Sequence, residues 1–480
     1  MDFRFLIIFI SLVGISTAFA INEYTGDSSV FLLFSITSNL LLYFGFRKNA
    51  IYFDTFIGIF LWLGFWFKTT VNVIFFDGHF SESVGSFTGS GLEFDHALLI
   101  ASLAFTALLI ASLIREKFIF IYPEKETENS SLFIFYSMHR KKVLIAYILV
   151  FITIAITNLY FSIYQRGGEK PVGIPVIITG VYTWLLLFGL SSFAALILKY
   201  EFSLKKKIVY FVPILTLVEA AITNMSLLSR GVLLNTSALG LGFIHFTKTH
   251  TIRINVKYLF LLISILIMLF LISLPLVDKL RDQAQATSQS QSQYQTKIVD
   301  SSIHAIKNFN LINSIQTTVY LLVNRSVGME GLLAISSSSG KSWDLLSSAL
   351  KERYVEHESS FYDTFIKSRY KNSDEIYQHT VSFPGFIAFF YYPGSTLFLF
   401  LALFILGICS ALIELLAYKL GQNNQILAAL IGQVIAYRFI HFGYVPSQSY
   451  LLFGTIFLNL FIIYGANKIL SLWYKKNRRC

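Results

Sequence analysis

The sequence NRSVGMEG at Asn324–Gly331 lies inside Asp278–Ser382, a long stretch without an apolar run of membrane-spanning length. On both sides of this stretch, apolar runs follow one another closely, each near the length that a helix needs to cross a bilayer. The stretch opens with a Gln/Ser tract, Gln283–Gln295, which is typical of a flexible tether. It interrupts an otherwise continuous series of apolar runs, and we expect most of the chemistry to take place here.

Composition places the chain among membrane proteins. Of its 480 residues, 55% are hydrophobic and 14% are charged, and the mean hydropathy is +0.63. Soluble domains carry about 25% charged residues. The two cysteines provide no disulfide framework, because Cys409 lies in an apolar run and Cys480 is the last residue. We therefore predict an all-α, polytopic integral membrane protein.

The apolar runs predict about twelve membrane-spanning helices. The first run, Phe3–Ala20, ends in a small-x-small pattern that resembles a signal-peptide cleavage site. The leading region carries a single cation, Arg4, beside Asp2, and a second run follows at once, so we expect an uncleaved span. The other predicted spans are Val30–Phe46, Ile51–Phe67, Ala97–Ile114, Val143–Tyr164, Ile174–Leu198, Ile208–Leu228, Val232–Phe246, Tyr258–Val277, Gly394–Tyr418, Ile426–Phe442 and Tyr450–Trp473.

The distribution of Lys and Arg predicts the orientation. With the N-terminus in the cytoplasm, the inner segments carry clusters such as Arg140–Lys142 and Lys475–Arg479. The short outer segments carry little beyond Lys68, Arg166, Lys170 and Arg230. We therefore predict about nine spans in residues 1–277, a large periplasmic loop in residues 278–393, about three spans in residues 394–480, and both termini in the cytoplasm. The net charge of +11 is then a topology signal, and we expect no nucleic-acid partner.

The large loop contains patterns of its own. Apolar residues recur at helical spacing from Ile303 to Leu322, and the loop as a whole predicts one or two helices lying on the outer membrane surface. The segment Ser382–Ser395 is apolar but has Pro-Gly pairs near both ends. It is too short to span the bilayer, and this favours a re-entrant or surface-lying segment.

Two outer segments contain candidate anion-binding arginines. Arg230, within Ser229–Gly231, is either a hairpin cap that reaches the interface or an anion clamp, since flanking Ser and Gly let backbone and guanidinium both approach a phosphate. Arg325 and Glu330 form either a structural salt bridge or a functional pair. Gly328 and Gly331 offer a surface for close approach, which favours substrate contact.

His379 is a candidate general base. A lone His is more often structural, but His379 precedes the Pro-Gly break, at the junction of loop and membrane where a base for surface chemistry has to stand. Ionisable residues inside spans are functional by default, because burying charge in lipid is costly. Those inside the predicted spans are Glu219, Glu414, Arg438 and His441. No metal-ligand cluster or common soluble catalytic motif occurs, so we expect no metal and no cofactor.

In these features the chain resembles the bacterial O-antigen polymerase (Wzy) family. The resemblance rests on about twelve spans with both ends inside, a large outer loop before the last three spans, and the segments Ser229–Gly231, Asn324–Gly331 and Pro384–Ser395. It covers the whole chain as architecture and is specific only at those segments. Some members repeat an Arg-and-Gly motif in two outer loops. Arg230 and Arg325 do not match its spacing, so only the arginines are carried over.

The resemblance implies glycosyl transfer on the periplasmic face of the bacterial inner membrane. A growing glycan on undecaprenyl diphosphate is the donor, a single repeat unit on the same carrier is the acceptor, and undecaprenyl diphosphate leaves. Fixed cations would bind the diphosphate, with Arg230, Arg325 and Arg438 as candidates. Glu330 or His379 would be the base. A polysaccharide chain-length regulator and a flippase are the expected protein partners.

Three other functions remain open. A flippase of lipid-linked oligosaccharides has about twelve spans, but internal symmetry and short outer loops are then expected. An O-antigen ligase shares the reaction type, uses the lipid A core as acceptor and has an outer-loop His to which His379 would correspond. A non-catalytic scaffold of envelope assembly would not need arginines gathered on one face. The sequence separates the polymerase from the ligase poorly.

Overall fold

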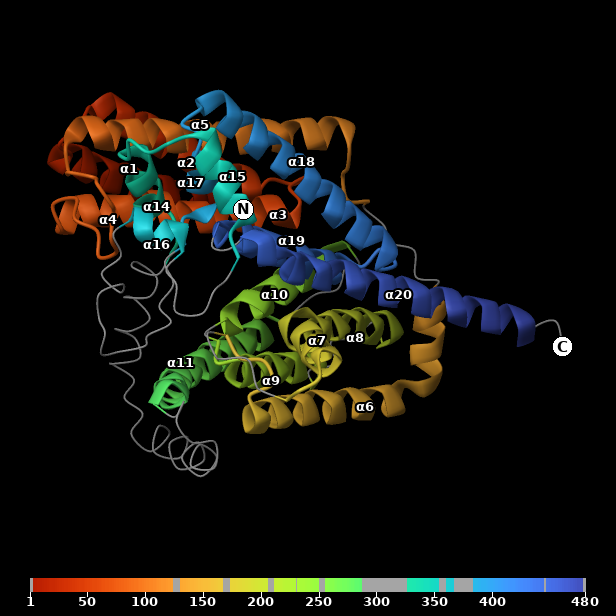
Figure 1. Ribbon diagram of the computed structural model, residues 1–480. Coiled ribbons are helices and arrows are strands. Elements are labelled where there is room, and N and C mark those ends of the chain that lie inside the picture. Colours follow the sequence, from red (N-terminus) through yellow and green to blue (C-terminus); the bar gives the residue numbers. More distant parts are fainter. Residues whose placement is uncertain are drawn as a thin grey trace. The chain divides into compact units, whose positions relative to one another are not determined.

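A computed structural model of the chain describes residues 3–123, 130–166, 173–205, 211–229, 231–249, 255–286, 326–353, 360–366, 383–443 and 446–477. Within these ranges every regular element is a helix, and there is no strand (Figure 1). Eight of the described helices are long and apolar enough to cross a membrane. The chain is therefore an all-helical, multi-pass membrane protein, as its composition predicts.

The eight candidate spans include two that contain a π-helical turn. The single helices are α2 (Ser28–Gly45), α5 (Gly91–Phe118), α6 (Ser131–Phe161), α11 (Val256–Ala286), α18 (Thr396–Leu420) and α20 (Ser449–Asn477). The composite spans are α3 (Tyr52–Leu61), η1 (Trp62–Phe67) and α4 (Lys68–Phe75), and α7 (Val176–Trp184), η2 (Leu185–Gly189) and α8 (Leu190–Lys205). Both composite spans stay continuous because an extra residue in a π turn widens the helix without ending it.

Four further helices coincide with predicted spans but are not among the eight: α1 (Phe3–Glu23), α9 (Phe211–Ser226), α10 (Val232–Thr249) and α19 (Gln425–Ile440). The short helices are α14 (Met329–Ser336), α15 (Trp343–Lys351), α16 (Phe361–Phe365), α17 (Gly385–Phe390) and the 3₁₀ turn η4 (Pro446–Gln448). The helix predicted over Ile303–Leu322 lies outside the described residues, and so does the Gln/Ser tract.

Contacts divide the chain into two compact units. Unit 1 contains residues 1–122, 318–413 and 435–452, and unit 2 contains residues 123–317, 414–434 and 453–480. The predicted division at residues 277 and 393 concerns the order of spans and loop along the chain, and it stays a prediction.

Small residues allow close packing in unit 1. Helices α2 and α5 lie side by side (Figure 1). Ala97, Ala101, Ala104 and Ala111 recur on α5 at helical spacing and are completely or almost completely buried. Without larger side chains at these positions, neighbouring helices can approach closely, which is the usual basis of helix packing in membranes.

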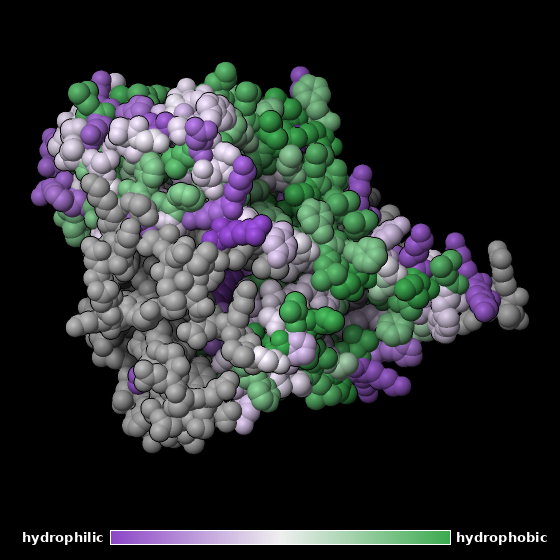
Figure 2. Space-filling view, in the orientation of Figure 1, coloured by the Kyte–Doolittle hydropathy of each residue, from purple (hydrophilic) through white to green (hydrophobic). Residues whose placement is uncertain are grey.

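Outward-facing apolar residues indicate where lipid covers the molecule. On α18 these are Leu397, Leu401, Ile405, Leu412 and Leu416. Figure 2 shows this helix as a largely hydrophobic surface. A soluble protein rarely exposes so continuous an apolar face, whereas a bilayer provides a matching solvent.

Candidate functional site

A buried ion pair joins α4, the last part of the composite span in unit 1, to α14 in residues 278–393. Lys68, the first residue of α4, forms an ion pair with Glu330 in the first turn of α14. The Lys68 residue is 1% exposed and Glu330 is 6% exposed. Lys68 Nζ also donates a hydrogen bond to the Ser326 carbonyl oxygen at 2.9 Å. One ammonium group therefore holds both the approach to α14 and its first turn.

Two glycines let the chain segments cross beside this pair. A Cβ atom added to Gly64, inside η1, would lie 2.2 Å from the Val327 carbonyl oxygen. A Cβ atom added to Gly328 would lie 2.1 Å from the Gly64 carbonyl oxygen. Both distances are far below van der Waals contact, so the π-helical turn and the start of α14 can meet only as glycine on glycine.

Helix α14 is buried along its whole length, from Met329 to Ser336. A Cβ atom added to Gly331 would lie 2.3 Å from the Pro384 carbonyl oxygen. The sequence predicts that Gly328 and Gly331 offer a surface for close approach, and they do, but the chain's own backbone occupies that surface at both positions. Their immediate role is therefore to seat α14 in unit 1.

The C-terminal end of α14 is closed by a second lysine. Lys341 Nζ donates to the carbonyl oxygen of Ser336 at 2.7 Å and also hydrogen-bonds the carbonyl oxygen of Ser338. A cation at this end satisfies free carbonyl groups and interacts favourably with the helix dipole. Partial burial lowers the pKa of Lys341. The two lysines thus fix opposite ends of the short helix.

The last part of residues 278–393 is built into the same unit. Helix α17 has six residues, which is too short to span a bilayer, and it is buried within unit 1 from Gly385 to Phe389. Gly385 has φ +75° and Gly443 has φ +105°, and a Cβ atom added to Gly443 would lie 2.5 Å from Pro384 Cγ. Positive φ favours glycine at both positions. Both alternatives that the sequence leaves open for this segment, re-entrant and surface-lying, stay predictions.

Arg438 and His441 lie near the Pro384–Gly385 corner. Arg438 is 8% exposed in the last turn of α19, and His441 follows the end of that helix. The His441 ring lies 4.1 Å from the Tyr437 ring and 5.3 Å from the Phe383 ring, centroid to centroid. The corner itself approaches the Ile440 carbonyl oxygen on one side and Val327 on the other. The Pro384–Gly385 corner therefore contacts both the helix that carries Glu330 and the chain just after Arg438.

Burial controls the electrostatics beneath this corner. Burial raises the pKa of Glu330, and the adjacent Lys68 ammonium opposes part of that increase. Burial also raises the pKa of Tyr362, a nearly inaccessible residue of α16, so its hydroxyl stays neutral. A carboxylate that is enclosed and paired cannot meet a substrate hydroxyl unless the segment opens. Glu330 is therefore better suited to hold α14 in position than to act directly as a base.

The other predicted site residues lie outside the described part of the chain: Arg230, Arg325 and His379. Of the described neighbours of Arg230, Ser229 N donates to the Asn224 carbonyl oxygen at 2.8 Å and Gly231 N donates to Ser229 Oγ at 3.2 Å. Whether Arg230 is a cap or an anion clamp stays a prediction, and so does the role of Arg325. The described partner of Glu330 is Lys68, which the sequence did not suggest.

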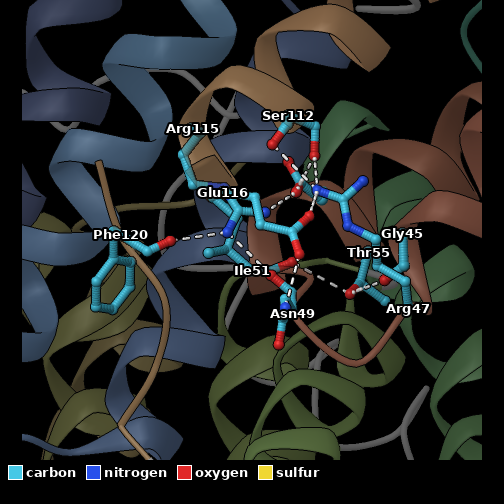
Figure 3. Close-up of polar contacts among 10 residues, drawn as sticks. Gly45, Arg47, Asn49, Ile51, Thr55, Ser112, Arg115, Glu116 and Phe120 are labelled. Carbon is cyan, nitrogen blue, oxygen red and sulfur yellow. Dashed lines mark hydrogen bonds and ion pairs between the residues drawn. The ribbon is translucent and has the colours of Figure 1, made fainter. Parts of the chain in front are cut away.

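A further charged cluster joins the ends of α2, α3 and α5 (Figure 3). Arg115, which is 1% exposed, pairs with Asp54 at 2.8 Å and donates to the carbonyl oxygens of Asn49 and Phe120, both at 2.9 Å. Arg47 pairs with Glu116 at 2.8 Å. Each guanidinium thus meets a carboxylate, so this cluster ties three helix ends together rather than presenting unbalanced charge.

Comparison with known proteins adds no relative. No family model matches the chain, no curated protein matches it, and no solved structure matches it. Functional argument therefore rests on the residues and their geometry.

Proposed function

We propose that this protein is a metal-independent glycosyltransferase of the O-antigen polymerase type in the bacterial inner membrane. It polymerises undecaprenyl-diphosphate-linked oligosaccharide repeat units at the periplasmic face. The growing glycan moves from its lipid carrier to an incoming lipid-linked repeat unit, and undecaprenyl diphosphate is released.

The observation that carries this proposal is the burial of two non-spanning helices in unit 1, α14 against the candidate span α5 and α17 against α14. Short helical pieces at membrane depth are tolerated only where protein encloses them or where they line a cavity. They occur in the segments, Asn324–Gly331 and Pro384–Ser395, on which the resemblance to the polymerases rests. A substrate with a lipid tail and a polar diphosphate would have to be met at such a junction.

The proposed topology has about twelve spans. Beyond the eight candidate spans, helices α1, α9, α10 and α19 would cross as shorter or less apolar helices. Both termini would lie in the cytoplasm, and residues 278–393 would form the large periplasmic loop. The Lys and Arg distribution supports this orientation.

In the proposed reaction, an acceptor sugar hydroxyl attacks the anomeric carbon of the donor glycan. The new glycosidic bond forms as the bond between that carbon and the diphosphate oxygen breaks, and the hydroxyl proton passes to a base. Arg230, Arg325 and Arg438 would bind the diphosphate, because fixed cations stabilise the negative charge that develops on the leaving group. Of the two candidate bases, His379 is preferred, since Glu330 is enclosed with Lys68.

Deletion of the gene tests the proposal against its rivals. Surface polysaccharide from the deletion strain should show lipid cores capped with a single repeat unit, because flipping and ligation continue without polymerisation. Cores with no cap would contradict the proposal and indicate a ligase or a flippase. A normal ladder of chain lengths would indicate a scaffold or an unrelated role. Complementation with the intact gene is the control for effects on neighbouring genes.

A further inference from the structure

Helix α9 forms the centre of unit 2, with α6, α8, α10 and α11 packed around it. It carries Thr216, Glu219, Thr223 and Ser226 at spacings of three or four residues, and all four are buried. This spacing places polar side chains on one face of the helix, inside a bundle where apolar residues are the norm.

The Glu219 carboxyl has an incomplete set of partners. Thr223 Oγ1 donates to Glu219 Oε1 at 2.9 Å. Tyr147, on α6, also interacts with the carboxyl, and its hydroxyl donates to the Leu190 carbonyl oxygen at 3.4 Å. Glu219 Oε2 is buried and has no hydrogen-bond partner among the described residues. Within the same part of the chain, no Lys, Arg or His forms an ion pair with Glu219.

Glu201, on α8, provides a direct contrast in the same unit. Both glutamates are completely buried. Glu201 forms an ion pair with Arg140, and it accepts hydrogen bonds from Arg140 Nη2 at 2.8 Å and from the Tyr136 hydroxyl at 2.7 Å. Among the described residues, the fold therefore provides a cation for one buried carboxylate and none for the other.

The physical consequence concerns the charge of Glu219. An isolated carboxylate removed from water is so costly that the group takes up a proton instead. We propose that Glu219, Tyr147 and Thr223 form a proton-binding site in the interior of unit 2. The Thr223 hydroxyl identifies Oε1 as the carbonyl oxygen of the neutral acid, and the unpartnered Oε2 carries the proton. Among the described side chains of α6, α8, α10 and α11, Tyr147 is the titratable group that interacts with Glu219.

Polar groups continue from this site toward one end of α9. Glu219 and Ser226 are two turns apart, about 10 Å along the helix axis. Asn158 Nδ2 donates to the carbonyl oxygen and the hydroxyl of Ser226, at 2.8 and 2.9 Å. Beyond it lies the turn at Ser229 and Gly231. Polar groups therefore lie on α9 between the Glu219 carboxyl and this end of the helix. The proposal does not depend on glycosyl transfer.

Infrared difference spectroscopy tests the protonation state directly. The full-length protein is purified in nanodiscs, and the spectrum of Glu219→Gln is subtracted from that of the wild type. At pH 7, an ordinary exposed glutamate is more than about 99% ionised. We expect the subtraction to yield instead the carbonyl-stretch band of a neutral carboxylic acid. The same subtraction with Glu201→Gln is the matched control and should yield carboxylate bands.

A carboxylate band for Glu219 at pH 7 would overturn the proposal. A second variant keeps the test independent of whether Glu219→Gln assembles. Thr223→Val removes the donor to Oε1 and should shift the acid carbonyl band to a higher frequency, since that carbonyl oxygen loses its hydrogen bond. If neither variant changes an acid band, Glu219 holds no proton and the site does not exist.

Discussion

Lys68 Nζ lies 2.9 Å from the carbonyl oxygen of Ser326, although 258 positions separate the two residues. The same ammonium group pairs with Glu330. A membrane-spanning segment near the N-terminus thus holds the entrance to α14, and the Ser326 carbonyl and the Glu330 carboxylate both meet its buried charge. The contact is therefore a natural point at which to perturb the candidate site.

Removing one partner of this pair should leave the other charge buried and unpaired. We expect Lys68→Met to destabilise the protein by about 3–5 kcal/mol, and Glu330→Leu to do so to a similar degree. The double variant should recover much of the loss, because neither charge remains. Melting of the purified protein in detergent, followed by tryptophan fluorescence, measures the effect. Lys117→Met removes an exposed lysine and is the matched control, expected to change stability by less than about 0.5 kcal/mol. Additive losses in the double variant would contradict this coupling.

The glycine crossing predicts a steric effect without any change of charge. Gly328→Ala places a methyl group against the Gly64 carbonyl oxygen and should destabilise the protein by about 1–3 kcal/mol. Gly180→Ala is the control, since no atom lies within 4 Å of its added Cβ and the residue is inside α7. There the better helix propensity of alanine should stabilise by about 0.5–1 kcal/mol. Equal melting temperatures for the two variants would rule out the tight crossing.

The charged cluster of Figure 3 predicts that Arg115 cannot be replaced by lysine without loss. The guanidinium bonds Asp54 and the carbonyl oxygens of Asn49 and Phe120, whereas a lysine ammonium is a compact charge on a flexible stem. We expect Arg115→Met to cost about 3–5 kcal/mol and Arg115→Lys to lose less. Protein abundance in membranes and detergent melting provide the measurement. Wild-type stability of Arg115→Met would show that the cluster is dispensable.

The proposed diphosphate site is tested at Arg230 and Arg325. Guanidinium engages phosphate oxygens through two parallel hydrogen bonds, which lysine cannot reproduce. Each Arg→Lys change should shorten the polysaccharide, each Arg→Ala change should do so more severely, and the double variant should be no worse than the more severe single one. Chain-length distributions are compared at matched membrane abundance. Full-length polysaccharide from both lysine variants would end this proposal. If Arg230 is only a hairpin cap, its lysine variant should make normal polymer. If Arg325 is only part of a structural salt bridge, its variants should fail through low protein levels.

The orientation is tested by reporter fusions. An alkaline phosphatase fusion at Ser338 should be active, because the Lys and Arg distribution predicts a periplasmic loop. A reporter that requires the cytoplasm should be silent at Ser338 and active after Lys476. The reverse pattern would invert the protein in the membrane and remove the basis for periplasmic chemistry.

The sequence predicted the helices better than the contacts between them. Periodicity and apolar length give the positions of spans such as α2 and α18, because the bilayer alone imposes that length. Apolar length also ended the third predicted span at Phe67, because the next residue, Lys68, is charged. This placed Lys68 in an outer turn. The helix continues to Phe75, since a partner distant in sequence neutralises the lysine.

The candidate site could be predicted only in part. Sequence proximity favours Arg325 as a partner of Glu330, and that pairing lies outside the described residues, whereas local spacing contains no information about Lys68. Gly328 and Gly331 correctly predicted a close approach at these positions. The sequence did not identify the backbone segments that approach them. The acidic residue inside α9 was recognisable as costly from its surroundings, whereas its missing cation became evident only from the packing of unit 2.

The Lys68 contact also has a consequence for biosynthesis. At translation rates of about 5–20 residues per second, on the order of 10–50 seconds pass between synthesis of Lys68 and of Ser326, 258 residues later. During that interval, the lysine is in a nascent membrane segment whose acidic partner has not yet been made. The half-finished chain must therefore shelter this charge in water, at a headgroup or with the insertion machinery, until the C-terminal third arrives and completes unit 1.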